Sequence, residues 1–325
     1  MEKVTMADVA KEAGVSKSTV SQYLNKRYEY MGEKTKLKIE EAIDRLGYHP
    51  NTLARSLKQK RTSMVGIIVA NILHYFSTSV IRAIEDFCQR NDLHAIVCNA
   101  DDNPEKEKRY VEMLRAKQVD GLIIFPNGQN HDLYKRMIDE GYPVVFVDRK
   151  VEDVDVFSVV TDNHESTYAA ITDFIKNGHQ NIAFVAQPLT ISTRRGRFEG
   201  YQQALADAGL KMNPNFVIES DLPEMTSKLE QLFSLEEKPT ALFAGNDRVF
   251  LVVMKFLKRK GIQLGKDLEL VVFDNIPFND LLESPISFIN QPALEMGEKA
   301  AELLFDQINK VDRAPGEFVF PSWRE

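Results

Sequence analysis

Three apolar runs in the body of this 325-residue chain each end in acid or amide side chains. Asp148 closes the run VVFVDR, Asn246 and Asp247 close ALFAGND, and Asp274 and Asn275 close LVVFDN. If these runs are parallel strands, their carboxyl ends border one crevice, where open α/β sheets bind ligands. Carboxylates and amides there suit a hydroxylated small molecule, since each sugar hydroxyl both donates and accepts hydrogen bonds. A single Asp at such a position is often only a helix cap, so the repetition supports the prediction.

A second set of functional side chains lies near the N-terminus. Thr5 and Asp8 have the spacing of a capping box, which predicts a helix that is stopped by Gly14. Ser16 is a good N-cap for a second helix over residues 17–25. Two short helices joined by such a turn predict a helix-turn-helix, whose second helix meets base edges in the DNA major groove.

Polar residues on the first turns of that second helix could read DNA. Lys17 could donate to guanine and Gln22 could pair with adenine, whereas Thr19 and Ser21 are better suited to phosphates. Ser18 projects from the same turns. The alternative is a plain three-helix bundle without a role in DNA binding.

A third helix is predicted over residues 33–46 and is stopped by Gly47. We expect it to pack Leu37, Ile43 and Leu46 against the first two helices.

The stretch that follows, residues 48–63, predicts a short conditional helix. Pro50 disfavours helix before it, and Asn51 can cap a helix that runs to Leu57. A helix of about two turns is marginal in water, so it should fold only against a partner surface. Small and apolar residues flanked by cations, such as Ala54 and Arg55, suit a DNA minor groove. An ordinary basic linker is the alternative.

The distribution of charge supports a polyanion as partner of the N-terminal part alone. Residues 1–61 carry 13 Lys+Arg against 8 Asp+Glu, whereas the remainder carries 28 against 40. Cys88 and Cys98 lack CxxC spacing and predict buried, reduced thiols. No signal peptide and no apolar run of membrane-spanning length is evident, so we expect a cytoplasmic protein.

The body of the chain alternates short apolar runs with amphipathic stretches, which predicts a doubly wound α/β fold. Buried parallel strands are predicted over 65–70, 95–98, 121–125, 144–148, 182–186, 241–244 and 270–273, with helices such as 105–117, 166–177 and 295–309 between them.

The runs VTMADVAKEAGVSKSTVSQYLN and KTKLKIEEAIDRLGYHPNTLARSLK resemble the DNA-binding headpiece and hinge of the lactose/galactose repressor (LacI/GalR) family. By this resemblance Ala54 and Leu57 contact the minor groove, and Leu57 intercalates. Gln22 stands where most members carry arginine, which predicts a different operator sequence. Residues 28–32 replace the usual loop ending in Val-Ser, which removes a good N-cap from the third helix. The expected DNA contacts are Thr5, Ser16, Lys17, Ser18, Thr19, Ser21, Gln22, Asn25, Asn51, Ala54, Arg55 and Leu57.

The resemblance extends over the body, which looks like the family's two-lobed periplasmic-binding-protein-like core. It implies a headpiece at 1–49, a hinge at 50–61 and an effector-binding core at 62–325. The N-lobe would comprise about 62–162 and 292–321, and the C-lobe about 163–291 and 322–325. The implied effector positions are Tyr75, Phe76, Asp148, Thr193, Arg197, Asn246 and Asp274. Tyr75 and Phe76 could instead belong to lobe core, and Arg197 to a structural ion pair.

The run TRRGR places Arg194 and Arg195 beside Arg197 at a predicted helix start, a setting that favours an anion. We therefore expect Arg195 among the effector contacts and an acidic effector such as a sugar acid. Alternatively, Arg194 and Arg195 merely face solvent. Overall similarity also suggests the subgroup that regulates ketodeoxygluconate use.

The function expected is a homodimeric transcriptional repressor of carbohydrate or sugar-acid catabolism, released from a pseudopalindromic operator by a small carbohydrate-like effector. No catalytic motif, metal-ligand spacing or cofactor-binding motif is found, so an enzyme is not expected. Two alternatives remain: control by a phosphorylated carrier protein, or a small-molecule-binding protein without a DNA role.

Overall fold

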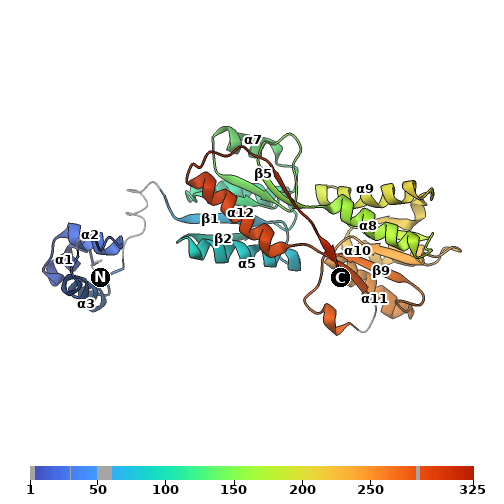
Figure 1. Ribbon diagram of the computed structural model, residues 1–325, viewed down its shortest axis with the longest axis horizontal. Coiled ribbons are helices and arrows are strands. Elements are labelled where there is room, and N and C mark those ends of the chain that lie inside the picture. The colour runs from blue at the N-terminus through green and yellow to red at the C-terminus, as the bar shows by residue number, and fades with distance from the viewer. Residues whose placement is uncertain (1–3, 30, 50–60, 283–285) are drawn as a thin grey trace. The chain divides into compact units, whose positions relative to one another are not determined.

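The computed structural model describes residues 4–29, 31–49, 61–282 and 286–325 (Figure 1). The chain forms two compact units, Met1–Thr62 and Ser63–Glu325. The expected hinge contacts Asn51, Ala54, Arg55 and Leu57 lie outside the described residues.

The first unit contains three helices, α1 (Met6–Ala13), α2 (Lys17–Leu24) and α3 (Glu33–Leu46). The Thr5 backbone N–H donates to Asp8 Oδ2 at 2.8 Å, and Gly14 ends α1 with a φ of 63°. Ser16 Oγ accepts a hydrogen bond from the Thr19 backbone N–H at 3.1 Å. The predicted helix-turn-helix is therefore confirmed, with the expected caps at both helix starts.

The core of this unit is small, and one predicted member is wrong. Val9, Val20 and Ile39 are fully buried, but Leu37 is 57% exposed. At about 100° per residue, Leu37 lies on the side of α3 opposite the face that buries Ile39 and Ala42. Gly32 is the N-cap of α3 and makes no side-chain cap hydrogen bond, as the loop sequence predicts.

The second unit has two lobes, and its described residues form two six-stranded sheets (Figure 1). The N-lobe sheet has the order β11-β5-β4-β3-β1-β2, and the C-lobe sheet has the order β12-β10-β9-β8-β6-β7. The N-lobe strands are β1 (Met64–Val69), β2 (His94–Asn99), β3 (Gly121–Ile124), β4 (Val144–Val147), β5 (Phe157–Thr161) and β11 (Glu317–Phe320). The C-lobe strands are β6 (Ile182–Ala186), β7 (Val217–Glu219), β8 (Ala241–Ala244), β9 (Glu269–Phe273), β10 (Ile286–Asn290) and β12 (Trp323–Arg324).

Helices cover both faces of each sheet, which confirms the predicted doubly wound α/β class. In the N-lobe these are α5 (Tyr75–Arg90) and α12 (Ala293–Ile308) on one face, and α6 (Pro104–Ala116) and α7 (His131–Asp139) on the other. In the C-lobe they are α8 (Asn163–Lys176) and α9 (Ser192–Asp207) on one face, and α10 (Leu222–Leu232) and α11 (Asp247–Lys260) on the other. In β1, Val65, Ile67 and Val69 face α5 and α12, and Ile68 faces α6 and α7, as strand alternation requires.

The chain passes between the two sheets at Asp162, at Gln291-Pro292 and at Ser322 in the described residues. Ser322 N–H donates to Asp162 Oδ1 at 2.9 Å, so two of these crossovers are bonded to each other. The last crossover leads into β12, which pairs antiparallel with β10, whereas β11 pairs parallel with β5.

Two helix pairs pack closely because each contains a glycine at the contact. A Cβ atom built at Gly200 of α9 would lie 2.3 Å from the backbone oxygen of His164 in α8. A Cβ atom built at Gly297 of α12 would lie 2.6 Å from the backbone oxygen of Val80 in α5. Side chains at these positions would force the helices apart.

The two cysteines are as predicted from the sequence. Cys88 and Cys98 are buried and free, and burial raises the pKa of the Cys88 thiol to about 11. In the part of the chain that the structure describes, every helix is too short or too polar to cross a bilayer.

Candidate functional site

A small cavity lies between the two lobes at the carboxyl ends of β1, β4, β8 and β9. We call it the inner cavity, and its volume is about 30 Å³. It is lined by Ala70, His74, Phe76, Ser77, Asp148, Arg149, Ile191, Thr193, Arg194, Arg197, Asn246 and Asp274. A volume of this size holds one or two waters. A sugar-sized molecule therefore requires the lobes or their side chains to move apart.

Asp148 and Asp274 occupy equivalent positions in the two lobes. Each follows a central strand with a positive φ, 71° for Asp148 and 72° for Asp274, a conformation that Asp tolerates better than most residues. The Asp148 N–H donates to Val159 on β5, and the Asp274 N–H donates to Ile289 on β10, at 2.9 and 3.0 Å. Both carboxylates are therefore held at the strand ends by the same backbone arrangement.

Arg197 and Asp274 are charged residues that line the C-lobe side of the inner cavity. Arg197 donates from Nε to Asn163 Oδ1 at 2.8 Å and from Nη1 to the Gly245 carbonyl at 2.6 Å, and its guanidinium lies 3.5 Å from the centre of the Phe273 ring. Its Nη1 is 3.9 Å from Asp274 Oδ2. Burial raises the pKa of Asp274 to about 6, and Arg197 opposes this rise. Arg197 thus has both a structural role and a position on the cavity wall.

Arg149 lies on the N-lobe side and is only 4% exposed. Its Nη1 is 2.8 Å from Asp102 Oδ1, and its Nε is 3.4 Å from Asp148 Oδ2. Burial disfavours the charged forms of Arg149 and Asp102, but the attraction between their charges outweighs it. The pKa of Arg149 is therefore raised and the pKa of Asp102 is lowered. This pair therefore remains charged beside the cavity.

Arg194 differs from the other two arginines. It is 8% exposed, donates from Nη1 to the Pro188 carbonyl at 3.0 Å, and has no carboxylate within ion-pair distance among the described residues. Burial, together with repulsion from Arg149, lowers the pKa of Arg194 to about 10. The cavity therefore contains a buried cation without a directly bonded anion.

Polar contacts join the lobes around this cavity. His74 Nδ1 is 2.5 Å from Asp247 Oδ1, and the Tyr75 N–H donates to Asp247 Oδ2 at 3.2 Å. The Lys150 N–H donates to Ser192 Oγ at 2.8 Å. These contacts link α5 with α11 and the loop after β4 with α9, and they hold the cleft narrow.

The structure brings together six of the expected effector residues: Phe76, Asp148, Thr193, Arg197, Asn246 and Asp274. It does not bring in Tyr75, which is 45% exposed, or Arg195, which donates to the Thr190 carbonyl and pairs with Glu152. The expected set lacked six cavity residues, the apolar Ala70 and Ile191 and the polar His74, Ser77, Arg149 and Arg194.

The helix-turn-helix presents Lys17, Ser18 and Gln22 to solvent. Ser16 is also exposed and lies within hydrogen-bond distance of Ser18 and Thr19 hydroxyls. Two other expected DNA contacts, Thr5 and Asn25, make hydrogen bonds within the headpiece. Thr5 bonds Asp8, and Asn25 Nδ2 donates to the Ser21 carbonyl at 2.7 Å.

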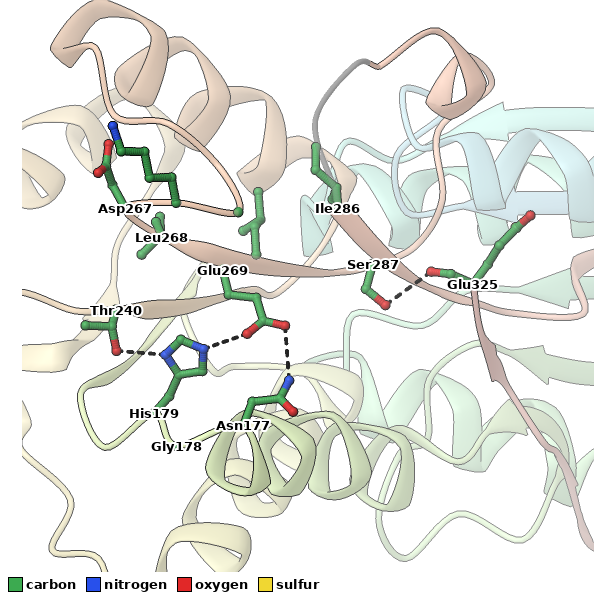
Figure 2. Close-up of a pocket in the computed structure, with 13 residues that line it drawn as sticks. Asn177, Gly178, His179, Thr240, Asp267, Leu268, Glu269, Ile286, Ser287 and Glu325 are labelled. Carbon is green, nitrogen blue, oxygen red and sulfur yellow. Dashed lines mark hydrogen bonds and ion pairs between the residues drawn. The ribbon is translucent and has the colours of Figure 1, made fainter.

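A larger pocket of about 880 Å³ lies at the amino ends of the C-lobe strands (Figure 2). Figure 2 shows His179 between Thr240 and Glu269. The His179 Nδ1 atom is 2.9 Å from Thr240 Oγ1, and its Nε2 atom is 2.6 Å from Glu269 Oε2. Because Glu269 begins β9 and Asp274 follows its end, this pocket is at the opposite edge of the sheet from the inner cavity. No group of His, Cys, Asp or Glu side chains in the described ranges is arranged to hold a metal ion.

Two family models match the chain. Residues 5–51 match "Bacterial regulatory proteins, lacI family", and residues 62–320 match "Periplasmic binding proteins and sugar binding domain of LacI family". This chain belongs to the LacI family. It is a helix-turn-helix, DNA-binding transcriptional regulator and not an enzyme.

Curated relatives span nearly the whole chain. The probable HTH-type transcriptional regulator EndR of Paenibacillus polymyxa is 44% identical over 312 residues, which cover 95% of this chain and 92% of the relative. The transcriptional repressor PurR of Vibrio atlanticus (strain LGP32) is 32% identical over 312 residues, 95% of this chain and 93% of the relative. The structure of the Lac repressor bound to ONPG has a TM-score of 0.87 at 24% identity and covers 100% of this chain and 98% of that one, which supports the fold of this LacI-family member.

Proposed function

We propose that this protein is a dimeric repressor of genes for carbohydrate or sugar-acid catabolism. It binds a pseudopalindromic operator through the helix-turn-helix and a hinge at 50–61, and a small acidic carbohydrate in the inner cavity releases it. The observation that carries the acidic effector is Arg194, a buried guanidinium without a carboxylate partner in the described residues.

An acidic sugar complements the cavity better than a neutral sugar does. A buried charge costs free energy unless it is paired, and a ligand carboxylate beside Arg194 would supply the missing partner. Asp148 and Asp274 can accept hydrogen bonds from ligand hydroxyls, and Asn246 can both donate and accept. Arg149 is already paired with Asp102, so Arg194 is the guanidinium available to the acid.

Ligand titration tests this assignment. We expect sugar acids such as D-galacturonate and D-gluconate to bind the wild-type protein more tightly than neutral glucose and galactose. A hydrogen bond to a charged group contributes about 1.5–3 kcal/mol, so Arg194→Gln should weaken acid binding about 10- to 100-fold. Neutral sugars should lose little affinity.

Arg195→Gln is the matched control, because it removes a neighbouring guanidinium that lies outside the inner cavity. Calorimetry on the full chain gives the affinities, and the fluorescence of Trp323, the chain's single tryptophan, reports motion at the last crossover. Tight binding of neutral sugars together with no binding of acids would reject the acidic effector.

The DNA-binding surface can be tested by selection of bound sequences from a random pool. Gln22→Ala should relax the preference at one base pair of each half-site, since a bidentate amide contact discriminates by about 1–3 kcal/mol. Thr19→Ala should weaken all sequences alike if Thr19 contacts phosphate. Equal sequence preferences for Gln22→Ala and wild type would exclude Gln22 from base contact.

The dimer follows from the proposed operator. Two copies of one helix-turn-helix, related by a two-fold axis, read the two half-sites of a pseudopalindromic sequence. Light scattering should give twice the chain mass of 37.1 kDa, and a monomeric mass at micromolar concentration would refute this part of the proposal.

A further inference from the structure

Ser63 is the point at which the N-terminal part of the chain joins the core. It is the first residue of the second compact unit and comes directly before β1. Its φ is 54°, in the left-handed region, although it is not a glycine. A non-glycine residue rarely adopts this conformation unless surrounding contacts hold it there. The contacts of Ser63 therefore decide the direction in which the chain enters β1.

Residues at the start of two neighbouring strands hold Ser63. Its backbone N–H donates to Asp120 Oδ2 at 2.8 Å, and its carbonyl accepts from the His94 N–H at 2.8 Å. Asp120 comes directly before β3, and His94 begins β2. The Asp120 N–H also donates to the Met64 carbonyl at 2.7 Å. A hydrogen bond to a carboxylate is stronger than one between neutral groups, so the Asp120 side chain makes the stronger of the two bonds to Ser63.

The backbone on both sides of Asp120 is held by the core of the N-lobe. Val119 is buried, and its carbonyl accepts from the Tyr142 hydroxyl at 2.8 Å. On the other side, a Cβ atom built at Gly121 would lie 2.8 Å from Leu304 Cδ1, so the start of β3 packs closely against α12. A close-packed interior resists displacement of such a segment. The Asp120 carboxylate is therefore a hydrogen-bond acceptor at a fixed position.

Strand β1 connects this point to the inner cavity. It lies between β2 and β3 and is buried from Val65 onward. Ala70, the residue after β1, lines the inner cavity. Because Ser63 is bonded to residues at the starts of β2 and β3, it moves together with this wall of the inner cavity when the N-lobe moves.

We propose that Asp120 is a positioning residue for operator binding, because its carboxylate sets the direction in which the hinge leaves the core. This rests on the proposed function, in which the two hinges of a dimer lead to the two half-sites of one operator. Without the Asp120 bond, Ser63 relaxes toward an extended conformation, and the separation of the two headpieces is no longer fixed. The protein then loses its requirement for one half-site spacing.

The test measures the operator affinity of the full chain as a function of half-site spacing. The probes are duplexes that carry the half-sites selected from the random pool, at the selected spacing and with one or two base pairs inserted or deleted at the centre. A duplex with a single half-site is included. Each inserted base pair rotates one half-site by roughly 34° and moves it by about 3.4 Å relative to the other. We expect wild type to prefer the selected spacing by about tenfold or more, because any other spacing requires deformation of the DNA or the protein, and Asp120→Ala to reduce this preference to about threefold or less.

Three further variants separate positioning from other effects. Asp120→Asn removes the charge but keeps an acceptor oxygen for the Ser63 N–H, so it should retain the wild-type preference. Ser63→Val leaves Asp120 in place but disfavours a positive φ, so it should reduce the preference as Asp120→Ala does. Asp139→Ala is the matched control, because Asp139 is an exposed carboxylate at the end of α7, and it should leave the preference unchanged.

The ratio of affinities between spacings distinguishes positioning from loss of stability, since a less folded variant loses affinity for every spacing alike. An unchanged preference in Asp120→Ala, an equal loss at every spacing, or an Asp120→Asn variant that behaves as Asp120→Ala would overturn the positioning role. A wild type that tolerates every spacing, yet binds the double site more tightly than the single half-site, would overturn it and leave the dimer standing. Equal wild-type affinities for single and double sites would reject the dimeric operator and the positioning role together.

Discussion

Replacing Asp274 by Asn should stabilise the core at neutral pH and have no such effect in acid. Asp274 is buried beside Arg197 and accepts a hydrogen bond from Gln291 Nε2 at 2.5 Å. Burial raises its pKa from 3.8 to about 6, even though Arg197 and Gln291 favour the charged form. The neutral carboxyl is therefore the form that the fold prefers, and Asn resembles that form in shape and in its ability to accept from Gln291.

The sign follows from linkage between protonation and folding. Because the folded-state pKa lies above the ordinary value, the folded state binds more protons between about pH 4 and pH 6. The stability contributed by this group is fully present below about pH 4 and is lost as the pH rises through about 6. A difference of about two in pKa corresponds to about 3 kcal/mol. We therefore expect Asp274→Asn to gain up to about 3 kcal/mol over wild type at pH 7.5 and nothing near pH 4.

Urea unfolding followed by far-ultraviolet circular dichroism measures this difference at pH 4.5, 6 and 7.5. The difference between variant and wild type removes the pH dependence of other groups that titrate identically in both. Asp280→Asn, at an exposed carboxylate after the same strand, is the control and should change stability by less than about 0.5 kcal/mol at each pH. A variant that is destabilised equally at every pH would show that the Arg197–Asp274 attraction outweighs burial, and would refute the argument.

Three further substitutions test the helix contacts, a cap and the hinge. Gly200→Ala should destabilise the core by roughly 1–3 kcal/mol in urea unfolding, because its Cβ meets the His164 carbonyl; Gly196→Ala on the same helix, where the nearest atom is at 3.4 Å, should instead stabilise it by up to about 1 kcal/mol. Ser16→Ala should lower headpiece stability in thermal unfolding by about 1 kcal/mol, since it removes the cap of α2. Leu57→Ala should weaken operator binding in a gel-shift titration and leave effector affinity unchanged, and equal operator affinity would exclude a minor-groove role.

Much of the fold could be predicted because most of its central strands are buried on both faces. The seven predicted strands correspond to β1, β2, β3, β4, β6, β8 and β9, and of these only the edge strand β2 is largely exposed. β5 is fully buried but was not predicted, because Ser158 and Thr161 interrupt its apolar run. β7 and β12 were not predicted, since three and two residues are too short for any periodic pattern. β10 and β11 alternate apolar with polar or exposed residues, and pairing with strands distant in sequence decides their structure.

The site could be predicted where a strand end fixes a side chain, and less well on helices. Asp148, Asn246 and Asp274 follow strands and line the inner cavity. Arg194 was not in the expected set, although helical geometry could have identified it. At about 100° per residue, Thr193, Arg194 and Arg197 share one side of α9, whereas Arg195 lies outside that sector. His74 is held at the cavity by its contact with Asp247, which lies in the other lobe and far along the chain. A local sequence pattern does not reveal such a contact.

The narrow cleft determines how an effector can act on the rest of the protein. A ligand shifts a conformational equilibrium only by its difference in affinity for the two states. In the present arrangement the inner cavity is about 30 Å³, and His74–Asp247 and Lys150–Ser192 close it on two sides. A sugar-sized effector therefore favours a wider arrangement and must replace both contacts. A hydrogen bond to the Asp247 carboxylate contributes about 1.5–3 kcal/mol and the neutral Lys150–Ser192 bond about 0.5–1.5 kcal/mol, so together they oppose that widening by about 2–4.5 kcal/mol. Typical coupling between allosteric sites is about 1–3 kcal/mol, so we expect the opening of these contacts to consume a large part of the free energy that one small molecule supplies.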